Sequence, residues 1–498
     1  MSDNRYSVNL NQPSGPHHLA YFSRGDSLRY LISVIPLATQ RPAPEGVHCA
    51  DGSALPHLRT SRRAILTWLL VSIAISIGWG YSIEASKDAG LEDFAAVYYG
   101  ARTVMDHHDP YRSGEYLEVY RREGGPLPRN NSQPSFWRVV PVCVNLPPTL
   151  LVVAPLALLG WGPAHLMWML LMPAGLLIAA WLALDLAADF GATMSLPLLC
   201  IVLANCEFLF QLGNATGIAV SLGVFAVWSF LRNRCVPAGI VCFGLGMALK
   251  PQEIGLIWLY FLLAGRVYRR RALASIGIAG GLAAVSLLWI ATVSPHWVQE
   301  WHANVAATSM RGDLNDPGPS SVGNMNLGMT TDLQSVLSYV KDDPGFYNPA
   351  ALLVCAPLLL AWLVVTVRGR SSRPEALLGV ASMAALSMLP IYHRQYDLKI
   401  LMLLIPACAL LCTKGRNLRI TALLVTAAAI VLTSDIPVAL LMLLNKSLRL
   451  PQDEALGKIA SVLTARCPTI VLLAAGVFYL WMYAGYAKRS AREPEGAG

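Results

Sequence analysis

Residues 64–82 read AILTWLLVSIAISIGWGYS, a continuous apolar run that follows Arg62 and Arg63. About 20 apolar residues in a helix cross the roughly 30 Å hydrocarbon core of a bilayer. Similar runs recur along most of the chain, and they lack the alternation of polar and apolar residues seen in barrel strands. Because only helices and closed barrels satisfy their backbones in lipid, the sequence predicts an all-α polytopic membrane protein.

The composition excludes an ordinary soluble protein. Of 498 residues, 55% are apolar and only 14% are charged, with a mean hydropathy of +0.48, which is too hydrophobic to solvate a globular surface. The net charge of +8 does not indicate nucleic acid, because the basic residues form short clusters between apolar runs, as cytoplasmic loops do. Ten scattered cysteines without a CxxC pair indicate neither a disulfide framework nor a zinc site.

The ends of the chain differ from its apolar middle. Residues 1–60 are polar and contain prolines, and no small-residue cleavage site follows their weak apolar patch, so they do not read as a signal peptide. We expect a mostly disordered cytoplasmic extension over residues 1–60, a transmembrane domain over 61–487 and a cytoplasmic tail over 488–498.

Basic clusters used as cytoplasmic anchors predict a topology. Four apolar pieces (147–163, 165–187, 196–211 and 215–231) lie between the first outer loop, 83–146, and the cluster at Arg232. An odd number of crossings is required, so one piece does not span. We expect it to be 147–163, which contains Pro147-Pro148 and Pro155 and is therefore predicted to be re-entrant or interfacial.

The remaining anchors complete the topology, with a second large outer loop over 293–350 and both termini inside. The total is about 12 spans. The later predicted spans are 235–250, 252–265, 272–292, 351–367, 376–391, 397–412, 419–433 and 467–486.

This topology places many polar residues on the outer face. Charges at membrane depth usually line a cavity or pair with one another. The polar residues on this face therefore predict an outward-facing polar cavity. The residues concerned are Glu92, Asp93, Asp109-Pro110-Tyr111, Gln211 to Asn214, Lys250-Pro251-Gln252 and Tyr392 to Asp397.

Simpler interpretations of the same residues remain open. Glu92 and Asp93 also suit a helix start, because acids favour helix N-termini, and Asp109-Pro110-Tyr111 is typical of a turn. Gly213-Asn214 fits a tight hairpin. Lys250 must either snorkel or meet an anion. Within Tyr392 to Asp397, His393, Arg394 and Asp397 also suit a local ion network that closes a turn.

Several motifs occur in a fixed order along the chain. They are DF at 93–94, DPY at 109–111, PLALL at 155–159, GN at 213–214, ALKPQ at 248–252, NMNLGM at 324–329 and YHRQYD at 392–397. In this order and on one membrane face they resemble glycosyltransferase family 87. Its members are polytopic enzymes of the GT-C class that use polyprenyl-phosphate sugars, notably mannosyltransferases.

The resemblance runs from about residue 64 to about residue 486 and shows two departures. Asn214 stands where a glutamine is expected, and the aromatic-Pro-Pro pattern is here Asn145-Leu146-Pro147-Pro148. Both departures bear on which substrate is used more than on the class of reaction.

The resemblance implies a GT-C fold and roles for individual residues. Asp93 is expected to be the general base, assisted by Glu92, in an inverting sugar transfer. Lys250, His393 and Arg394 are expected to bind the donor phosphate. The residues expected to bind substrate are Tyr98, Asn214, Gln252, Asn324, Asn326 and Asp397.

The expected partners are a polyprenyl-phosphate sugar donor, a lipid or glycan acceptor and membrane lipids, with no nucleic acid. No metal ligand and no cofactor is assigned, and a divalent metal is left open. The expected location is the inner (plasma) membrane, with the active site facing the periplasm or outside.

A polytopic transporter is the main alternative, since about 12 spans with internal polar residues suit one. Against it, the halves show no repeat, and two large outer loops are unusual for such folds. A lipid-linked glycan flippase or ligase fits the sidedness nearly as well. Neither would need Asp93 as a base.

Overall fold

The computed structural model describes residues 61–85, 92–124, 142–191, 193–313, 315–321, 330–369, 372–434 and 466–490. These residues all belong to one unit of the chain, Arg59–Gly498. They form helices, joined by loops that include an isolated antiparallel bridge between Thr330 and Arg394. The prediction of an all-α protein is therefore confirmed for the described residues. The predicted N-terminal extension, 1–60, lies outside them.

Seven helical segments in the described part are long and apolar enough to cross a membrane. They are α2 (Arg62–Ala85), α6 (Trp161–Ala188), α7 (Ser195–Ala204) with α8 (Glu207–Leu212), α12 (Gly265–Ala291), α16 (Pro344–Arg368), η2 (Gln395–Leu403) with α18 (Leu404–Cys412), and α22 (Cys467–Ser490).

Shorter helices occupy the other predicted spans. They are α9 (Thr216–Arg232), α10 (Val236–Leu249), α11 (Pro251–Leu263), α17 (Arg373–Leu386) and α19 (Arg416–Leu432). A helix thus occurs at each predicted span, but these helices are shorter than the roughly 20 residues of a full crossing. The count of about 12 spans stays a prediction.

Helix α5 (Pro147–Ala157) occupies the piece that was expected not to span. It has 11 residues, so its axis is only about 17 Å long. Pro147 and Pro148 begin the helix, where a missing N–H matters least, and the chain turns at Gly160 before α6 begins. The length of α5 is compatible with a re-entrant or interfacial segment.

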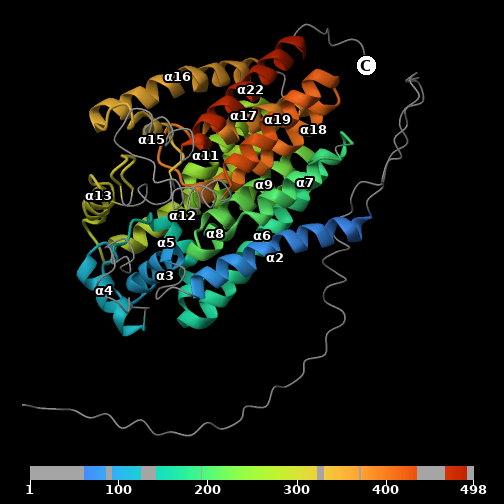
Figure 1. Cartoon of the computed structure of the whole chain (residues 1–498). Helices are drawn as coiled ribbons and strands as arrows, with labels where there is room; N and C mark the ends of the chain where they lie inside the picture. The colour runs from blue at the N-terminus through green and yellow to red at the C-terminus, as the bar shows by residue number, and fades with distance from the viewer. Residues whose placement is uncertain are drawn as a thin grey trace, which may run out of the picture. The chain divides into compact units, whose positions relative to one another are not determined.

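The long helices pack side by side (Figure 1), with α9 contacting both α6 and α10, and α17 contacting α22. Glycines permit close approach at these contacts: a Cβ at Gly379 would lie 2.6 Å from the Tyr260 ring, and one at Gly476 would lie 2.5 Å from Leu386. The outer surfaces carry exposed apolar side chains, including Trp68, Trp79, Leu288, Leu353 and Trp481. Apolar surface on this scale suits contact with lipid.

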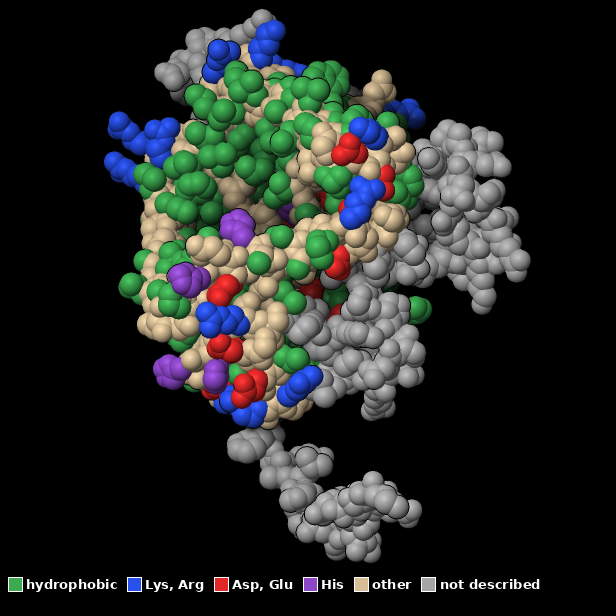
Figure 2. Space-filling model, turned by 90° about the vertical axis from the view of Figure 1, so that its left-hand side faces the viewer, with side chains coloured by type: hydrophobic (Ala, Val, Ile, Leu, Met, Phe, Trp, Pro, Cys, Tyr) green, Lys and Arg blue, Asp and Glu red, His purple; other side chains and the backbone are tan. Residues whose placement is uncertain are grey.

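The predicted outer loops contain helices of their own. α3 (Glu92–Met105) and α4 (Ser113–Arg122) lie in the first, and α13 (Trp297–Thr308) and α15 (Leu333–Leu337) in the second. α3, α4, α5 and α13 lie at one end of the bundle (Figure 1). Figure 2 faces this side of the protein, where acidic, basic and histidine side chains gather below a broad hydrophobic area.

Asp185 and Asp189, at the C-terminal end of α6, form ion pairs with arginines from two of the basic clusters used as cytoplasmic anchors, Arg232 to Arg234 and Arg368 to Arg373. The Arg232 guanidinium lies 2.7 Å from Asp185 and 2.9 Å from Asp189, and Arg373 also pairs with Asp189. Asp185 is buried. Because Arg232 and Arg373 both pair with Asp189, the two clusters lie close together. This agrees with the prediction that both clusters are on the same membrane face.

Candidate active site

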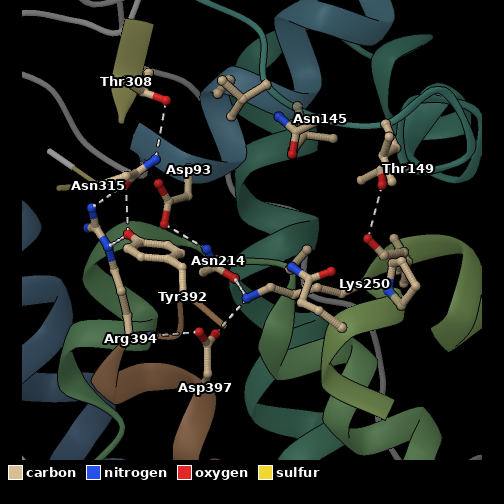
Figure 3. Close-up of a pocket in the computed structure, with 18 of the residues that line it drawn as sticks. Asp93, Asn145, Thr149, Asn214, Lys250, Thr308, Asn315, Tyr392, Arg394 and Asp397 are labelled. Carbon is tan, nitrogen blue, oxygen red and sulfur yellow. Dashed lines mark hydrogen bonds and ion pairs between the residues drawn. The ribbon is translucent and has the colours of Figure 1, made fainter. Parts of the chain in front are cut away.

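A cavity of about 320 Å³ lies where six separate stretches of the chain converge (Figure 3). Its walls come from α3, the segment before α5 with the first turn of that helix, the turn between α8 and α9, the junction of α10 and α11, α13 with the loop after it, and the loop after α17 with the start of η2. All of these segments belong to, or border, the predicted outer face. Its polar lining residues include Asp93, Asn145, Thr149, Asn214, Lys250, Gln252, Thr308, Asn315, Tyr392, Arg394 and Asp397.

Asp93 enters the cavity from the first turn of α3. The amide of Asn214 donates to its carboxylate, with Nδ2 2.8 Å from Oδ2. Burial raises the pKa of Asp93, while the positive charge of Arg394 and the Asn214 hydrogen bond act in the opposite direction. Asn214 reaches this place because α8 ends at Gly213 in the left-handed conformation, φ 65°, which glycine adopts readily.

Lys250 stands between two helices because Pro251 follows it. A residue before proline avoids the helical conformation, and Lys250 is not helical, with φ −153° and ψ 79°. Its ammonium donates to Asp397, with Nζ 2.5 Å from Oδ1, and to the side-chain Oδ1 of Asn214 at 3.3 Å. It also contacts the hydroxyl of Thr216. The amine therefore meets an anion supplied by the protein, at the wall of the cavity.

The loop after α17 supplies the second cation. The Arg394 side chain donates to Asn315, with Nη2 3.1 Å from Oδ1, and also contacts the Tyr392 hydroxyl. The backbone N–H of Arg394 donates to Asp397 Oδ2 at 2.8 Å. Asp397 thus binds the Arg394 backbone with one oxygen and the Lys250 ammonium with the other. The expected local network of His393, Arg394 and Asp397 is replaced by one that reaches Lys250, 147 residues away.

A comparison with known protein families gives a match over the central segment of the chain. Residues 145–391 match the family model of glycosyltransferase family 87. No curated protein and no solved structure matches the chain. The match, together with the seven long apolar helices, indicates a membrane glycosyltransferase.

The segment that matches the family model supplies only part of the cavity. It contains Asn214 and Lys250, whereas Asp93 precedes it and Arg394 and Asp397 follow it. Direct hydrogen bonds join these three residues to the segment, because Asp93 binds Asn214, Asp397 binds Lys250 and Arg394 binds Asn315. The cavity therefore combines the family segment with residues on either side of it.

His393 lies beside this cavity without lining it. Its side chain is fully buried, with Nδ1 3.0 Å from the Ile391 carbonyl and Nε2 3.8 Å from Glu253 Oε1. Burial lowers the pKa of His393. Sequence reasoning did not select Glu253. Its position three residues after Lys250, in the first turn of α11, was the available signal.

The other expected site residues are placed as follows. Gln252 lines the cavity. Tyr98 is buried, does not line the cavity and donates to the Leu159 carbonyl at 2.7 Å, and Glu92 begins α3 without lining the cavity. Asn324 and Asn326 lie outside the described residues. Among the residues described, no cluster of three or more His, Cys, Asp or Glu is suited to hold a metal.

The Asp-Pro-Tyr motif forms a turn that supports the cavity wall. Asp109 Oδ1 accepts from the Tyr111 N–H at 2.9 Å, and the Tyr111 hydroxyl donates to the Asn145 carbonyl at 2.8 Å. Burial, together with the neighbouring carboxylate of Glu300, raises the pKa of Asp109 to about 6. The turn interpretation of this motif agrees with the geometry.

Helix α13 holds the same wall from the other side. Trp301, which lines the cavity, donates from Nε1 to the Val144 carbonyl at 2.9 Å. Asn304 donates to the carbonyls of Tyr111 (2.9 Å) and Cys143 (3.1 Å). Sequence reasoning missed Trp301 and Asn145, because their role depends on contacts between the two outer loops.

Proposed function

We propose that this protein is an integral-membrane glycosyltransferase that moves a sugar from a polyprenyl-phosphate donor to an acceptor hydroxyl. The reaction occurs at the outer face of the plasma membrane and inverts the anomeric centre. Mannose is the favoured sugar, through the family resemblance. The observation that carries the proposal is that the carboxylate of Asp93 and two cations, Lys250 and Arg394, line a single cavity. The other carboxylate of the cavity, Asp397, is paired with Lys250.

Asp93 is the general base of this reaction. The acceptor hydroxyl transfers its proton to the carboxylate as its oxygen bonds to the sugar carbon, and the bond to the phosphate oxygen breaks. Burial raises the pKa of Asp93, which makes its carboxylate a stronger base than an exposed aspartate. Asn214 binds Oδ2, so Oδ1 is the oxygen that receives the proton.

Lys250 and Arg394 stabilise the departing phosphate. The donor phosphodiester carries one negative charge, and a second develops on the leaving oxygen when the sugar departs. Positive groups that are already in place stabilise such charge strongly where water is excluded. Gln252, Asn145 and Thr149 line the same cavity, and they are suited to bind sugar hydroxyls.

The test compares two adjacent acids. Asp93→Asn keeps the size of the side chain and its hydrogen bond with Asn214 but removes the base. With polyprenyl phosphomannose as donor and membranes that contain equal amounts of protein, we expect sugar transfer to fall by roughly 10²- to 10⁴-fold. Glu92→Gln is the matched control and should retain most activity, because Glu92 does not line the cavity. Wild-type transfer by Asp93→Asn would remove the central assignment.

A further inference from the structure

A second carboxyl group lies behind Lys250. Glu253, in the first turn of α11, is fully buried, and its Oε1 lies 3.3 Å from the Lys250 ammonium. Neither of its oxygens has a hydrogen-bond partner among the described residues. An ionised carboxylate in such a place is strongly unfavourable. The protein therefore needs a means to neutralise Glu253.

His393 faces the same oxygen. Its Nδ1 lies 3.0 Å from the Ile391 carbonyl, which only accepts hydrogen bonds, so Nδ1 carries a hydrogen. In a neutral imidazole Nε2 is then an acceptor, and it points at Glu253 Oε1 from 3.8 Å with no hydrogen-bond partner of its own. Two acceptors that face each other in a dry site repel each other. One proton between Glu253 and His393 removes that repulsion.

The balance of charges around Lys250 also indicates that Glu253 and His393 hold a proton. Its ammonium contacts both Asp397 (2.5 Å) and Glu253 (3.3 Å), and one cation does not balance two carboxylates. Close acids oppose each other's ionisation, and an incoming phosphate adds another negative charge. The other charged and titratable groups of the cavity are Asp93 from α3, Tyr392 and Arg394 from the loop after α17, and Tyr396 from η2.

We propose that Glu253 and His393 are positioning residues that hold one proton behind Lys250, and that this proton lets the cavity accept the anionic phosphate of the donor. The inference rests on the proposed function and deepens it. When the pair has lost its proton, donor binding must take one up. Donor affinity therefore falls as the pH rises, although a phosphodiester does not itself titrate near neutral pH.

The direct test is calorimetry on the full chain in detergent, with polyprenyl phosphomannose as the ligand. Titrations in two buffers of different ionisation enthalpy count the protons that are taken up. For the wild type at alkaline pH we expect uptake of about one proton and a loss of affinity of about tenfold per pH unit. Glu253→Gln cannot hold the proton and carries no charge. It should bind at alkaline pH as tightly as the wild type does at lower pH, with little uptake.

Two variants separate this effect from general damage. Glu253→Asp keeps a carboxyl group and should keep the pH dependence. Glu375→Gln is the matched control: Glu375 on α17 is also fully buried, its oxygens also lack hydrogen-bond partners, and it does not line the cavity. Its pH profile should equal that of the wild type.

If Glu253→Gln does not fold, His393→Gln provides a second test. The introduced amide can donate to the Glu253 carboxylate without an added proton. The loss of donor affinity should therefore begin at a lower pH than in the wild type. An unchanged profile in this variant would contradict the shared proton.

The outcomes distinguish this inference from the proposed function. If the wild type transfers sugar and Glu253→Gln keeps the full pH slope and proton uptake, only the inference fails. If the donor binds with a pH slope that Glu253→Gln abolishes, but no sugar is transferred, the inference stands and the proposed function fails. If the donor does not bind at any pH, both fail.

Discussion

The amide nitrogen of Asn214 lies 2.8 Å from a carboxylate oxygen of Asp93, although the two residues are 121 positions apart. The amide has a defined orientation, because its oxygen accepts from the Thr216 N–H at 2.9 Å and from Lys250 at 3.3 Å. Its nitrogen therefore faces Asp93. Asn214 thus links the proposed base to the cation that is proposed to bind phosphate.

Removal of this amide should impair catalysis. A hydrogen bond to a charged group contributes about 1.5–3 kcal/mol, so Asn214→Ala should lower kcat for sugar transfer by roughly 10- to 100-fold, with a smaller change in KM. The control is Asn417→Ala, at an exposed position of α19, which should leave both constants unchanged. A kcat equal to that of the wild type would show that Asn214 does not orient the base.

Asp93→Asn should stabilise the protein while it abolishes transfer. The pKa of Asp93 in the folded protein is above its ordinary 3.8 because of burial. An acid with a raised pKa stabilises the fold only when protonated, so this contribution is present below about pH 4 and is lost as the pH rises through the folded-state value. Asparagine avoids that loss, and we expect a higher Tm for Asp93→Asn at pH 7.

The gain in Tm should disappear in acid, where Asp93 itself is protonated. Thermal unfolding in detergent at about pH 7 and about pH 4 measures both values. Glu118→Gln, on the exposed side of α4, should give the wild-type Tm at each pH. A lower Tm for Asp93→Asn at pH 7 would mean that Arg394 and Asn214 outweigh the effect of burial.

Asn304→Ala should loosen the cavity wall. It removes the hydrogen bonds from α13 to the carbonyls of Tyr111 and Cys143, at a cost of about 1–3 kcal/mol. Amide hydrogen exchange over residues 142–146 should accelerate by roughly tenfold or more. Gln299→Ala, at an exposed position of the same helix, should not change it. Equal exchange in the two variants would show that Asn304 does not hold this segment.

Gly379→Ala should destabilise the helix packing around α17. The added Cβ would lie 2.6 Å from the Tyr260 ring and 3.0 Å from the Tyr483 ring, and both rings are fully buried. Overpacking of this kind costs about 1–3 kcal/mol, which should appear as a lower Tm in detergent. Gly277→Ala, on α12 with nothing within 4 Å of the new Cβ, should be neutral or stabilising by up to about 1 kcal/mol. Equal Tm values for the two variants would contradict the close packing.

Local features of the sequence were sufficient to predict that the described residues are helical. Helix type follows from the length and continuity of apolar runs such as 64–82, because lipid leaves the backbone no other partner. The Pro147-Pro148 start and the internal Pro155 marked the segment that became the short helix α5. The expected clustering of polar residues also agrees with the cavity, since Asp93 and Lys250 both line it. The number of spans and their orientation in a membrane stay predictions.

The sequence did not show which polar residues of the candidate site contact one another. Tyr98 and Asp93 lie five residues apart in one helix, yet Asp93 lines the cavity whereas the Tyr98 hydroxyl binds the Leu159 carbonyl. His393 and Arg394 are adjacent, yet one faces Glu253 and the other faces Asn315. Neighbouring side chains point in different directions, so proximity in sequence does not decide their contacts.

The sequence by itself therefore determined that this chain is helical and apolar, because these properties depend on local composition. That its polar residues lie on one membrane face stays a prediction from the order of the charged clusters. The tertiary structure decided that Asp93 binds Asn214, that Lys250 binds Asp397, and that Glu253 and His393 meet behind them. Hydrogen bonds and ion pairs form over about 3–4 Å, and only the folded chain brings residues more than 100 positions apart within that range.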